Sequence, residues 1–509
     1  MQADPSRNQL RATLAAVPVA AAALIPVLVL VRLAFDAPFE PGGRNLRILG
    51  NTVALTALTV AGACALGVPL ALATTCLRRS GAGVAFMLLA IPLALPSYIG
   101  AFAFFAATGP GGELEALVGF APPAVRGLAG SVWVMTLYTF PFVLLSVRAS
   151  LRGLDAGIVD AARTMGLSPA GAIFRVVLPR IRGGIAAGAL LVALYTLSDF
   201  ATPAILGLDT FTRAIYVEYN AFGLGRAAWL SLQLLGLVAV VLFFESRARR
   251  IRERPGRTLR WTPPPALRVA FWLVVGAVGL SAVGLPVALF LVWLIREGTG
   301  GFDPATVRHS VVPAALAAGT AVICAIPVAR AASMGKPGRW MARLTAFGFG
   351  IPGIVMGTAL VYVGLRLPLL YQTTAMLVLG YVLRFLPLAV GALRDGLERL
   401  EGNVQHAARS LGAGPGETFR RVSLPLVLPG VLSGAALVYL EAMRELPLTL
   451  LLRPTGAETL TTRLWQVYEA GYFGEAALPG LILIGVSSLA LLLFLRSERV
   501  LGLAAESEA

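Results

Sequence analysis

The sequence predicts an all-α, polytopic membrane protein with about 12 transmembrane helices arranged as two parallel six-helix repeats. The 509 residues are 57% hydrophobic and only 13% charged, whereas soluble proteins carry about 25% charged residues. Long uncharged stretches match the roughly 20 apolar residues that a helix needs to cross a bilayer. The sequence also repeats itself internally. This composition excludes a water-soluble enzyme.

Apolar runs of membrane-spanning length recur from one end of the chain to the other. Arg7 and Arg11 precede the first run, which is too long for a signal-peptide core, so we expect it to stay as a helix. The runs cover residues 12–35, 53–76, 83–108, 128–148, 183–206, 226–245, 266–295, 311–333, 344–368, 372–393, 427–446 and 477–495. We expect each run to form one membrane helix.

A basic segment divides these runs almost in the middle of the chain. Residues 246–265 contain many arginines and end at three consecutive prolines. We interpret them as a cytosolic linker between two six-helix halves, residues 1–245 and 266–509. The net charge is +16, and the cations gather in the loops that this arrangement places in the cytosol. The positive-inside rule then puts both termini in the cytoplasm and accounts for the basic charge without a nucleic-acid partner.

The two halves repeat each other. Residues 148–188 align without a gap on residues 394–434, at an offset of 246, and both stretches follow the fourth helix of their half. Self-similarity of this kind indicates a duplicated architecture. Because each half has an even number of helices, the repeats share one orientation and are related by an axis along the membrane normal. The matched stretch is also the most polar part of each half, which indicates a binding role.

Each copy of the matched stretch predicts a helix-turn-helix on the cytosolic face. A helical stretch ends at Gly166 or Gly412, and a second short helix follows a turn that contains a proline. Glycine suits the stop of a helix and proline suits its first turn. A Leu-Pro pair, at 178/179 or 424/425, then starts the next membrane helix. Small side chains before each glycine leave a shallow surface for a partner: Ala161 and Ala162 in the first copy, Ala407 and Ala408 in the second.

These loops resemble the EAA motif of ABC-importer permeases, which has an acidic residue, two alanines, a glycine four residues after the second alanine, and a Leu-Pro. In that family the short helix docks in a cleft of a separate ATP-hydrolysing subunit. The second copy departs from the motif, because the neutral side chain of His406 stands where the acid belongs. The alternative is a generic amphipathic connector. The resemblance implies an ATPase-docking surface made of Asp160, Ala161, Ala162 and Gly166, and of Ala407, Ala408 and Gly412.

Two further stretches resemble the fused iron(III)-importer permeases of bacteria. They are YTLSDFATPAILGLDTFTRAIY from Tyr195 and ELPLTLLLRPTGAETLTTRLWQVYEAGYFGEAALPG from Glu445. Thiamine permeases share the fused architecture and are the alternative within this class. The resemblance implies a multi-pass protein of the bacterial inner membrane. Its expected partners are two cytosolic ATP-binding subunits, a periplasmic solute-binding protein and membrane lipid.

We do not expect the chain to be an enzyme or to bind a cofactor. The sequence contains no P-loop pattern GxxxxGK[ST], so the resemblance implies that the partner subunits use the ATP. An ion-coupled six-plus-six secondary transporter would also have parallel halves, but it gives no reason for two matching cytosolic loops. His309 and His406 lack a carboxylate or cysteine at ligand spacing, and we therefore expect no metal site.

Few charged residues fall within the predicted helices, where such residues usually face a cavity or a partner. Asp199 and Glu445 occupy equivalent positions about four turns into the fifth helix of each half, while Glu441 has no counterpart. One hypothesis is that these carboxylates line a translocation path for a hard cation such as iron(III). The alternative is that Glu441 pairs with Arg444, three residues on. Asp199 and Glu445 would then lie at the outer interface and contact the binding protein.

Overall fold

The computed structural model describes residues 5–38, 42–76, 79–221, 223–248, 265–299, 301–399, 407–408 and 410–489. All regular structure in these ranges is helical, which confirms the all-α class. Nine helices there are long and apolar enough to cross a bilayer, or up to 11 spans if each of two bent pairs counts as one. The count of 12 stays a prediction, because the last predicted run is described only as a shorter helix, Phe473–Leu489. Most of the predicted linker lies outside the described residues.

Every apolar run predicted in the first half falls on helical structure, and short connectors separate the helices. The helices of this half are α1 (Pro5–Ala22), α2 (Ile25–Phe35), α3 (Gly43–Cys76), α4 (Arg79–Ala90), η1 (Ile91–Leu93), α5 (Ser97–Ala107), α6 (Glu113–Val118), α7 (Gly127–Arg152), α8 (Ala156–Thr164), α9 (Pro169–Ala172), η2 (Ile173–Val177), α10 (Leu178–Ser198), α11 (Ala201–Ile205), α12 (Phe211–Asn220) and α13 (Leu224–Ala248).

The second half follows the same order of long and short helices. They are α14 (Pro265–Gly279), η3 (Leu280–Gly284), α15 (Leu285–Glu297), α16 (Ala305–Met334), α17 (Lys336–Gly350), α18 (Gly353–Arg366), α19 (Thr374–Arg399), α21 (Pro415–Thr418), η4 (Phe419–Ser423), α22 (Leu424–Arg444), α23 (Pro447–Leu452), α24 (Leu460–Ala470) and η5 (Phe473–Ala476).

The third membrane segment of each half is bent rather than continuous, so the single helices predicted over 83–108 and 344–368 are wrong. The axis turns by 83° between Gly83–Leu93 and Ser97–Ala107, and by 99° between Lys336–Gly350 and Gly353–Arg366. Pro96 and Pro352 stand at the two corners in extended backbone, with ψ of 134° and 143°. Proline has no N–H to continue a helix and disfavours helical geometry in the residue before it. Both bends therefore have the same cause.

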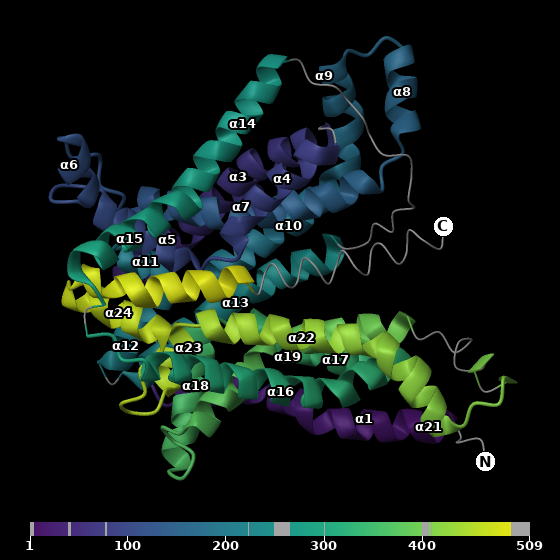
Figure 1. Cartoon of the computed structure of the whole chain (residues 1–509). Helices are drawn as coiled ribbons and strands as arrows, with labels where there is room; N and C mark the ends of the chain where they lie inside the picture. The colour runs from purple at the N-terminus through teal and green to yellow at the C-terminus, as the bar shows by residue number, and fades with distance from the viewer. Residues whose placement is uncertain are drawn as a thin grey trace.

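The first helices of the two halves are exchanged. Helix α1 packs on α16 and α17 of the second half, and α2 packs on α18 of the second half as well as on α13 of its own half. In return, α14 packs on α4, and α15 packs on α5, in the first half. Figure 1 shows the purple α1 beside α16 and the teal α14 rising beside α4. The buried apolar side chains accordingly form two large clusters, each with residues from both halves. The division into residues 1–245 and 266–509 stays a prediction, and packing unites helices across it.

Candidate functional site

The first matched loop is a helical hairpin closed by its own backbone. Asp155 caps α8 by accepting a hydrogen bond from the main-chain N–H of Gly157 at 3.0 Å. At the other end of α8, Gly166 has a φ of +93°, a conformation that glycine adopts without steric cost. The N–H of Leu167 then donates to the carbonyl oxygen of Ala162 at 3.2 Å. This bond closes the helix end as in a Schellman motif.

The second loop repeats the same closure. Gly412 has a φ of +88°, and the N–H of Ala413 donates to the carbonyl oxygen of Ala408 at 3.1 Å. Helix α21 follows, as α9 follows in the first loop. His406 lies outside the described residues, so its side chain has no structural description here. The predicted glycine stops are thus present in both loops with nearly the same geometry.

The predicted docking residues differ in exposure. Asp160 and Ala161 are exposed on α8, whereas Ala162 is only 3% exposed. Helix α8 packs on α9 and η2, and Ala162 is buried within this hairpin. In the second loop Ala407 is exposed and Ala408 is partly buried. The first alanine of each pair is therefore open to a partner, and the second is more buried.

One exposed apolar side chain lies directly before each glycine, at a position that the motif does not include. The side chain of Met165 is 79% exposed and that of Leu411 is 89% exposed. The two residues occupy equivalent positions at the offset of 246, directly before Gly166 and Gly412. An apolar residue repeated at one position in an otherwise polar loop is the signal that could have found them. Exposed apolar side chains of this kind are typical of contact surfaces.

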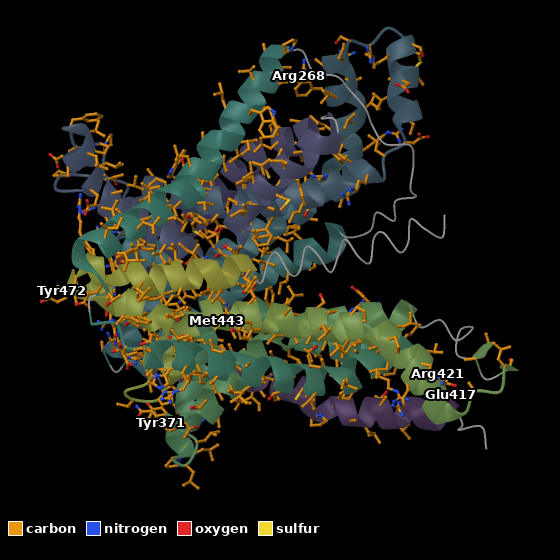
Figure 2. All side chains as sticks on the ribbon, viewed as in Figure 1. Arg268, Tyr371, Glu417, Arg421, Met443 and Tyr472 are labelled. Carbon is orange, nitrogen blue, oxygen red and sulfur yellow. The ribbon has the colours of Figure 1, made fainter. Side chains whose placement is uncertain are left out.

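Both loops lie at the same end of the molecule. In Figure 1, α8 and α9 are at the upper right and α21 is at the lower right, and α1 also begins at this end. Figure 2 labels Glu417 and Arg421 on the lower loop, where they form an ion pair at 2.8 Å. A chain with two such loops facing one side can contact a pair of partners on that side.

The helical structure is interrupted at Asp199 and at Glu445, which directly follow the fifth helices of the two halves. Helix α10 ends at Ser198 and α22 ends at Arg444, so the prediction that both carboxylates lie within a helix is wrong. Their backbone is extended, with φ and ψ of −74° and 120° at Asp199 and −73° and 121° at Glu445. The physical reason is that each carboxylate accepts a hydrogen bond from an N–H group at the start of the next helix.

Each carboxylate accepts a hydrogen bond from an N–H three residues later. Oδ1 of Asp199 accepts from the N–H of Thr202 at 3.1 Å, and Oε1 of Glu445 accepts from the N–H of Leu448 at 3.2 Å. These bonds satisfy donors at the start of α11 and α23, which a helix leaves without an internal partner. Negative charge is also favourable at a helix N-terminus.

The main-chain carbonyl groups at the two breaks are satisfied in the same way. The hydroxyl of Thr212 donates to the carbonyl oxygen of Asp199 at 2.9 Å, and that of Thr461 donates to the carbonyl oxygen of Glu445 at 3.2 Å. Since a buried unpaired carbonyl is costly, these threonines stabilise both breaks. The backbone of the site is therefore duplicated in detail.

The side-chain partners of the two carboxylates differ. Asp199 is partly buried and receives only hydroxyl donors on Oδ2, from Ser97 at 2.5 Å and Thr202 at 2.7 Å. The Ser97 hydroxyl also lies 3.2 Å from the hydroxyl of Tyr195. These neutral donors leave the negative charge of an ionised Asp199 without a cationic partner among its described contacts.

Glu445 instead pairs with an arginine. Its side chain is buried, and Oε1 lies 3.2 Å from a terminal nitrogen of Arg384, which is itself only 9% exposed. Gly353, at the start of α18, makes room for this pair, because a Cβ atom there would collide with both side chains. The matching place at the start of α5 is Ser97, the hydroxyl donor to Asp199.

Glu441 forms the short-range pair that its spacing predicts. Arg444 binds the carboxylate of Glu441 through two nitrogens, which confirms the alternative proposed for this residue. Arg444 also donates to the carbonyl oxygen of Leu93 at 3.1 Å, and the hydroxyl of Tyr98 donates to the carbonyl oxygen of Arg444 at 3.4 Å. Both of these contacts join the end of α22 to the bend of the first half. The described contacts include none between Asp199 and Glu445 themselves.

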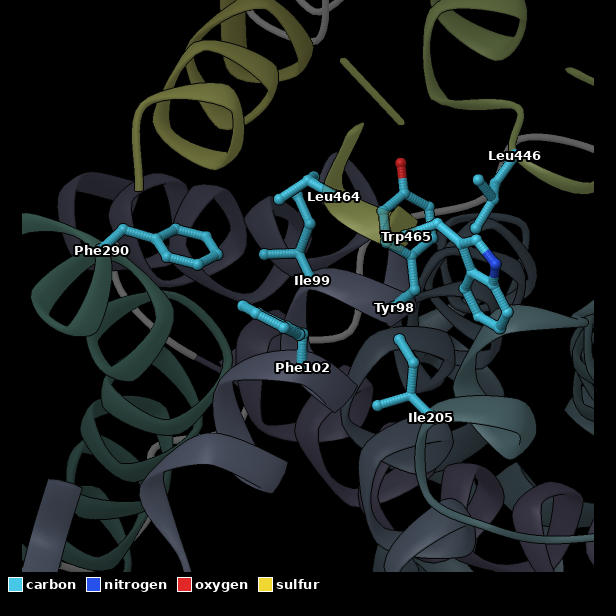
Figure 3. A pocket seen from close by; sticks show the side chains of 8 residues that line it. All are labelled: Tyr98, Ile99, Phe102, Ile205, Phe290, Leu446, Leu464 and Trp465. Atoms are coloured by element: carbon cyan, nitrogen blue, oxygen red, sulfur yellow. The ribbon is translucent and has the colours of Figure 1, made fainter. Parts of the chain in front are cut away.

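A small apolar pocket lies beside these breaks. Figure 3 shows its lining side chains, with the Tyr98 hydroxyl and the Trp465 ring nitrogen as their polar groups. The lining comes from both halves: Tyr98, Ile99, Phe102, Ile205, Phe290, Leu446, Leu464 and Trp465. No group of three or more His, Cys, Asp or Glu side chains that could hold a metal ion occurs in the described part of the chain. The lining is largely apolar and offers a cation few ligands.

These observations define an integral membrane protein with a duplicated transport-type core. A family model described as "Binding-protein-dependent transport system inner membrane component" matches residues 63–251 and again residues 317–501. The chain belongs to this family, which confirms the resemblance to ABC-importer permeases and the assignment as a multi-pass inner membrane protein. The exchanged helices α1, α2, α14 and α15 all lie outside the two matched ranges.

Several curated proteins are similar over most of the chain. The Fe(3+)-transport system permease protein FbpB 2 of Haemophilus influenzae is 29% identical over 465 residues, which cover 88% of each chain. The ferric transport system permease protein FbpB of Actinobacillus pleuropneumoniae is 23% identical over 490 residues, covering 89% of this chain and 71% of that protein. A probable molybdenum ABC transporter permease of Haloferax volcanii is 32% identical, but over only 37% of this chain.

Proposed function

We propose that this chain is the permease of a binding-protein-dependent ABC importer for iron(III), with both membrane halves in one polypeptide. The observation that carries the proposal is the similarity to two permeases named for ferric transport over nearly the whole chain. Membership of the family does not agree with the alternative of an ion-coupled secondary transporter. The chain supplies the membrane path, binds no cofactor itself, and depends on ATP used by partner subunits.

Two ATP-binding subunits would dock at the two matched loops, and a periplasmic solute-binding protein would dock at the opposite end. Two loops with the same glycine closure at one end of the molecule support this arrangement. The termini would then be cytoplasmic, as the arginine distribution predicts.

The docking surface would consist of an exposed acidic residue, a small residue and an apolar residue. In the first loop these are Asp160, Ala161 and Met165, and Gly166 sets the turn that holds them. In the second loop Ala407 and Leu411 are the exposed counterparts, with Gly412 at the turn. Ala162 and Ala408 would support the surface from behind. A partner that closes a cleft on each surface could move the attached membrane helices.

The translocation path would pass the two helix breaks. Iron(III) prefers oxygen ligands, and carboxylates are suited to hard cations. Asp199 is the more available of the three candidate carboxylates, because its described partners are neutral, whereas Glu441 and Glu445 pair with arginines. A single carboxylate with hydroxyl neighbours binds weakly, and weak binding allows an ion to leave again.

Uptake by reconstituted permease tests the proposal. The permease and its ATPase subunits are placed in proteoliposomes, and radiolabelled iron(III) or thiamine is added outside with its own binding protein. We expect ATP-dependent uptake of iron and none of thiamine, measured per inserted permease. Thiamine uptake without iron uptake contradicts the iron assignment and leaves the importer class intact. ATP-independent uptake driven by an ion gradient contradicts the class.

A further inference from the structure

A second cavity lies at the end of the molecule opposite the paired loops. It is a partly open hollow of about 270 Å³ between the N-terminal parts of α16 and α19 and the segment that joins α23 to α24. This volume is several times the roughly 30 Å³ that one water molecule occupies in the liquid. The lining residues are Arg308, His309, Val312, Pro313, Thr374, Leu377, Arg453, Pro454, Ala457 and Thr459. None of them is acidic.

The basic side chains of this cavity come from separate elements and are not neutralised there. Arg308 is exposed on α16, and neither it nor His309 has an ion pair or side-chain hydrogen bond among the described residues. Arg453 donates to the carbonyl oxygen of Ala457 at 3.2 Å. Its other partner is the amide oxygen of Gln466 at 3.1 Å, once that amide is oriented to suit both of its neighbours. Both described partners of Arg453 are neutral groups, so they do not balance its positive charge.

Two acidic side chains that stand close in the sequence to lining residues have other described partners. Glu458 pairs with Arg463 at 3.6 Å, and Asp303 accepts a hydrogen bond from the N–H of Ala305 at 2.8 Å, just before α16. Neither lines the cavity. The long helix α19 begins at Thr374 in the cavity wall, and the positive end of its dipole adds to the field of the two arginines.

The first half lacks these cations at the matched positions, and its segment between α11 and α12 is shorter and runs differently, with a φ of +75° at Gly207 against −60° at Arg453. The positions matched to Arg308 and His309 are Gly50 and Asn51, and the position matched to Arg453 is Gly207. Asn51 there donates to the carbonyl oxygen of Asp209 at 2.9 Å. The first half therefore folds without cations at these positions.

We infer that this cavity is a binding site for a small oxyanion of the phosphate or carboxylate class. Arginine matches such anions with paired N–H donors, and two arginines, a histidine and Thr374 line one concave space. The cavity is concave and sized for a small anion, whereas a flat basic patch suits a larger partner. Bound anion would join α16, α19 and the segment before α24, and this site is independent of the solute that the permease moves.

The phosphate chemistry has two possible sources, free phosphate and a phospholipid headgroup, and the test separates them. Purified full-length permease is placed in nanodiscs of neutral phosphatidylcholine, and inorganic phosphate is titrated in by calorimetry against chloride at equal ionic strength. We expect saturable phosphate binding. A second set of nanodiscs contains anionic phosphatidylglycerol. Unchanged phosphate affinity there assigns the site to a free anion, and weakened affinity assigns it to the headgroup.

Arginine substitutions test whether this cavity is the site. Arg308→Gln should weaken phosphate binding about tenfold, the factor expected for one lost charge-assisted hydrogen bond, and Arg308→Gln with Arg453→Gln should weaken it further. Arg308 has no described partner, so its loss should leave folding intact. Arg339→Gln is the matched control, because Arg339 is exposed on α17, outside the cavity lining.

Two results would overturn the inference. One is phosphate binding no stronger than chloride binding in the unchanged protein. The other is equal phosphate affinity in the control and in the double variant. A double variant that lowers only the affinity for the periplasmic binding protein, with phosphate binding unaltered, assigns these arginines to protein docking instead.

Discussion

At residue 199 the chain leaves α10 and at residue 445 it leaves α22, with almost the same backbone angles, yet the two carboxylates meet different partners. Asp199 is held by hydroxyl groups, and Glu445 is held by the buried guanidinium of Arg384. The shared part, a carboxylate that caps the next short helix, is what the duplication requires. The part that differs is the charge of the partners, which are neutral hydroxyl groups in one half and a guanidinium group in the other.

The largest effect should follow from breaking the buried pair of the second half. Arg384→Met leaves Glu445 buried without its cation, and removing one partner of such a pair costs about 3–5 kcal/mol. Ser97→Ala in the first half removes one hydroxyl donor from Asp199 and should cost about 1.5 kcal/mol. Thermal unfolding of both variants in nanodiscs checks the order. An equal or smaller loss for Arg384→Met would contradict the prediction that the buried ion pair holds its break more strongly.

Substitution of the equivalent glycines should have the same effect in both matched loops, in contrast to substitutions at the two helix breaks. Gly166→Val and Gly412→Val place a branched side chain at a left-handed position, which costs about 1–2 kcal/mol, although the space around both glycines is open. We expect ATP-driven uptake to fall about tenfold, the factor that corresponds to 1.4 kcal/mol. Uptake is measured per inserted molecule with both partner proteins present.

Gly414→Val is the matched control for the loops. Gly414 lies in the same turn as Gly412, also in open space, but without a positive φ. It should keep most of the uptake. Full coupled uptake by either Gly166→Val or Gly412→Val would contradict the docking assignment for that loop.

Neutralising the two carboxylates should separate transport from stability. Asp199→Asn should lower iron uptake several-fold per folded molecule, whereas Glu445→Gln should chiefly lower the amount of folded permease, because it leaves Arg384 without a counter-charge. The double variant should transport less than either single variant. Uptake and melting temperature are measured on the same preparations. Normal uptake per folded molecule in Asp199→Asn would exclude it from the path.

The smallest effect concerns the difference between the two loops. Asp160 is exposed and can pair with a cation of the ATPase, and an exposed ion pair contributes about 0.2–1 kcal/mol. Asp160→Ala should therefore lower coupled ATPase activity about two- to fivefold, and His406→Ala should change it less. Reconstituted ATPase assays compare the two. Equal losses would mean that the loops dock through the same contacts despite the substitution.

The parts of the structure that depend on local sequence could be predicted. Apolar runs located the membrane helices because burial in lipid needs only length and hydrophobicity. The glycine stops at 166 and 412 and the pair of Glu441 with Arg444 also depend on residues within one or two turns. The bends at Pro96 and Pro352 were missed, although prolines before short helices were a usable signal.

Long-range contacts were not predictable in the same way. Arg384 and Glu445 are 61 residues apart in the sequence, and neither segment contains a local pattern that predicts the pairing. The exchange of the first helices was not predictable from hydropathy either. In a membrane an apolar helix surface contacts lipid as favourably as it contacts another apolar helix, so hydropathy does not determine which helices pack together.

The exchanged first helices set the order in which the chain can assemble. Roughly 280 residues separate the end of α1 at Ala22 from the start of its partner α16 at Ala305, or roughly 15–60 s of synthesis at 5–20 residues per second. During this interval the face of α1 that packs on α16 and α17 has no partner from the second half. The helices of the first half are therefore made before their packing can be completed. A polypeptide that stops before α16 lacks the helices on which α1 packs.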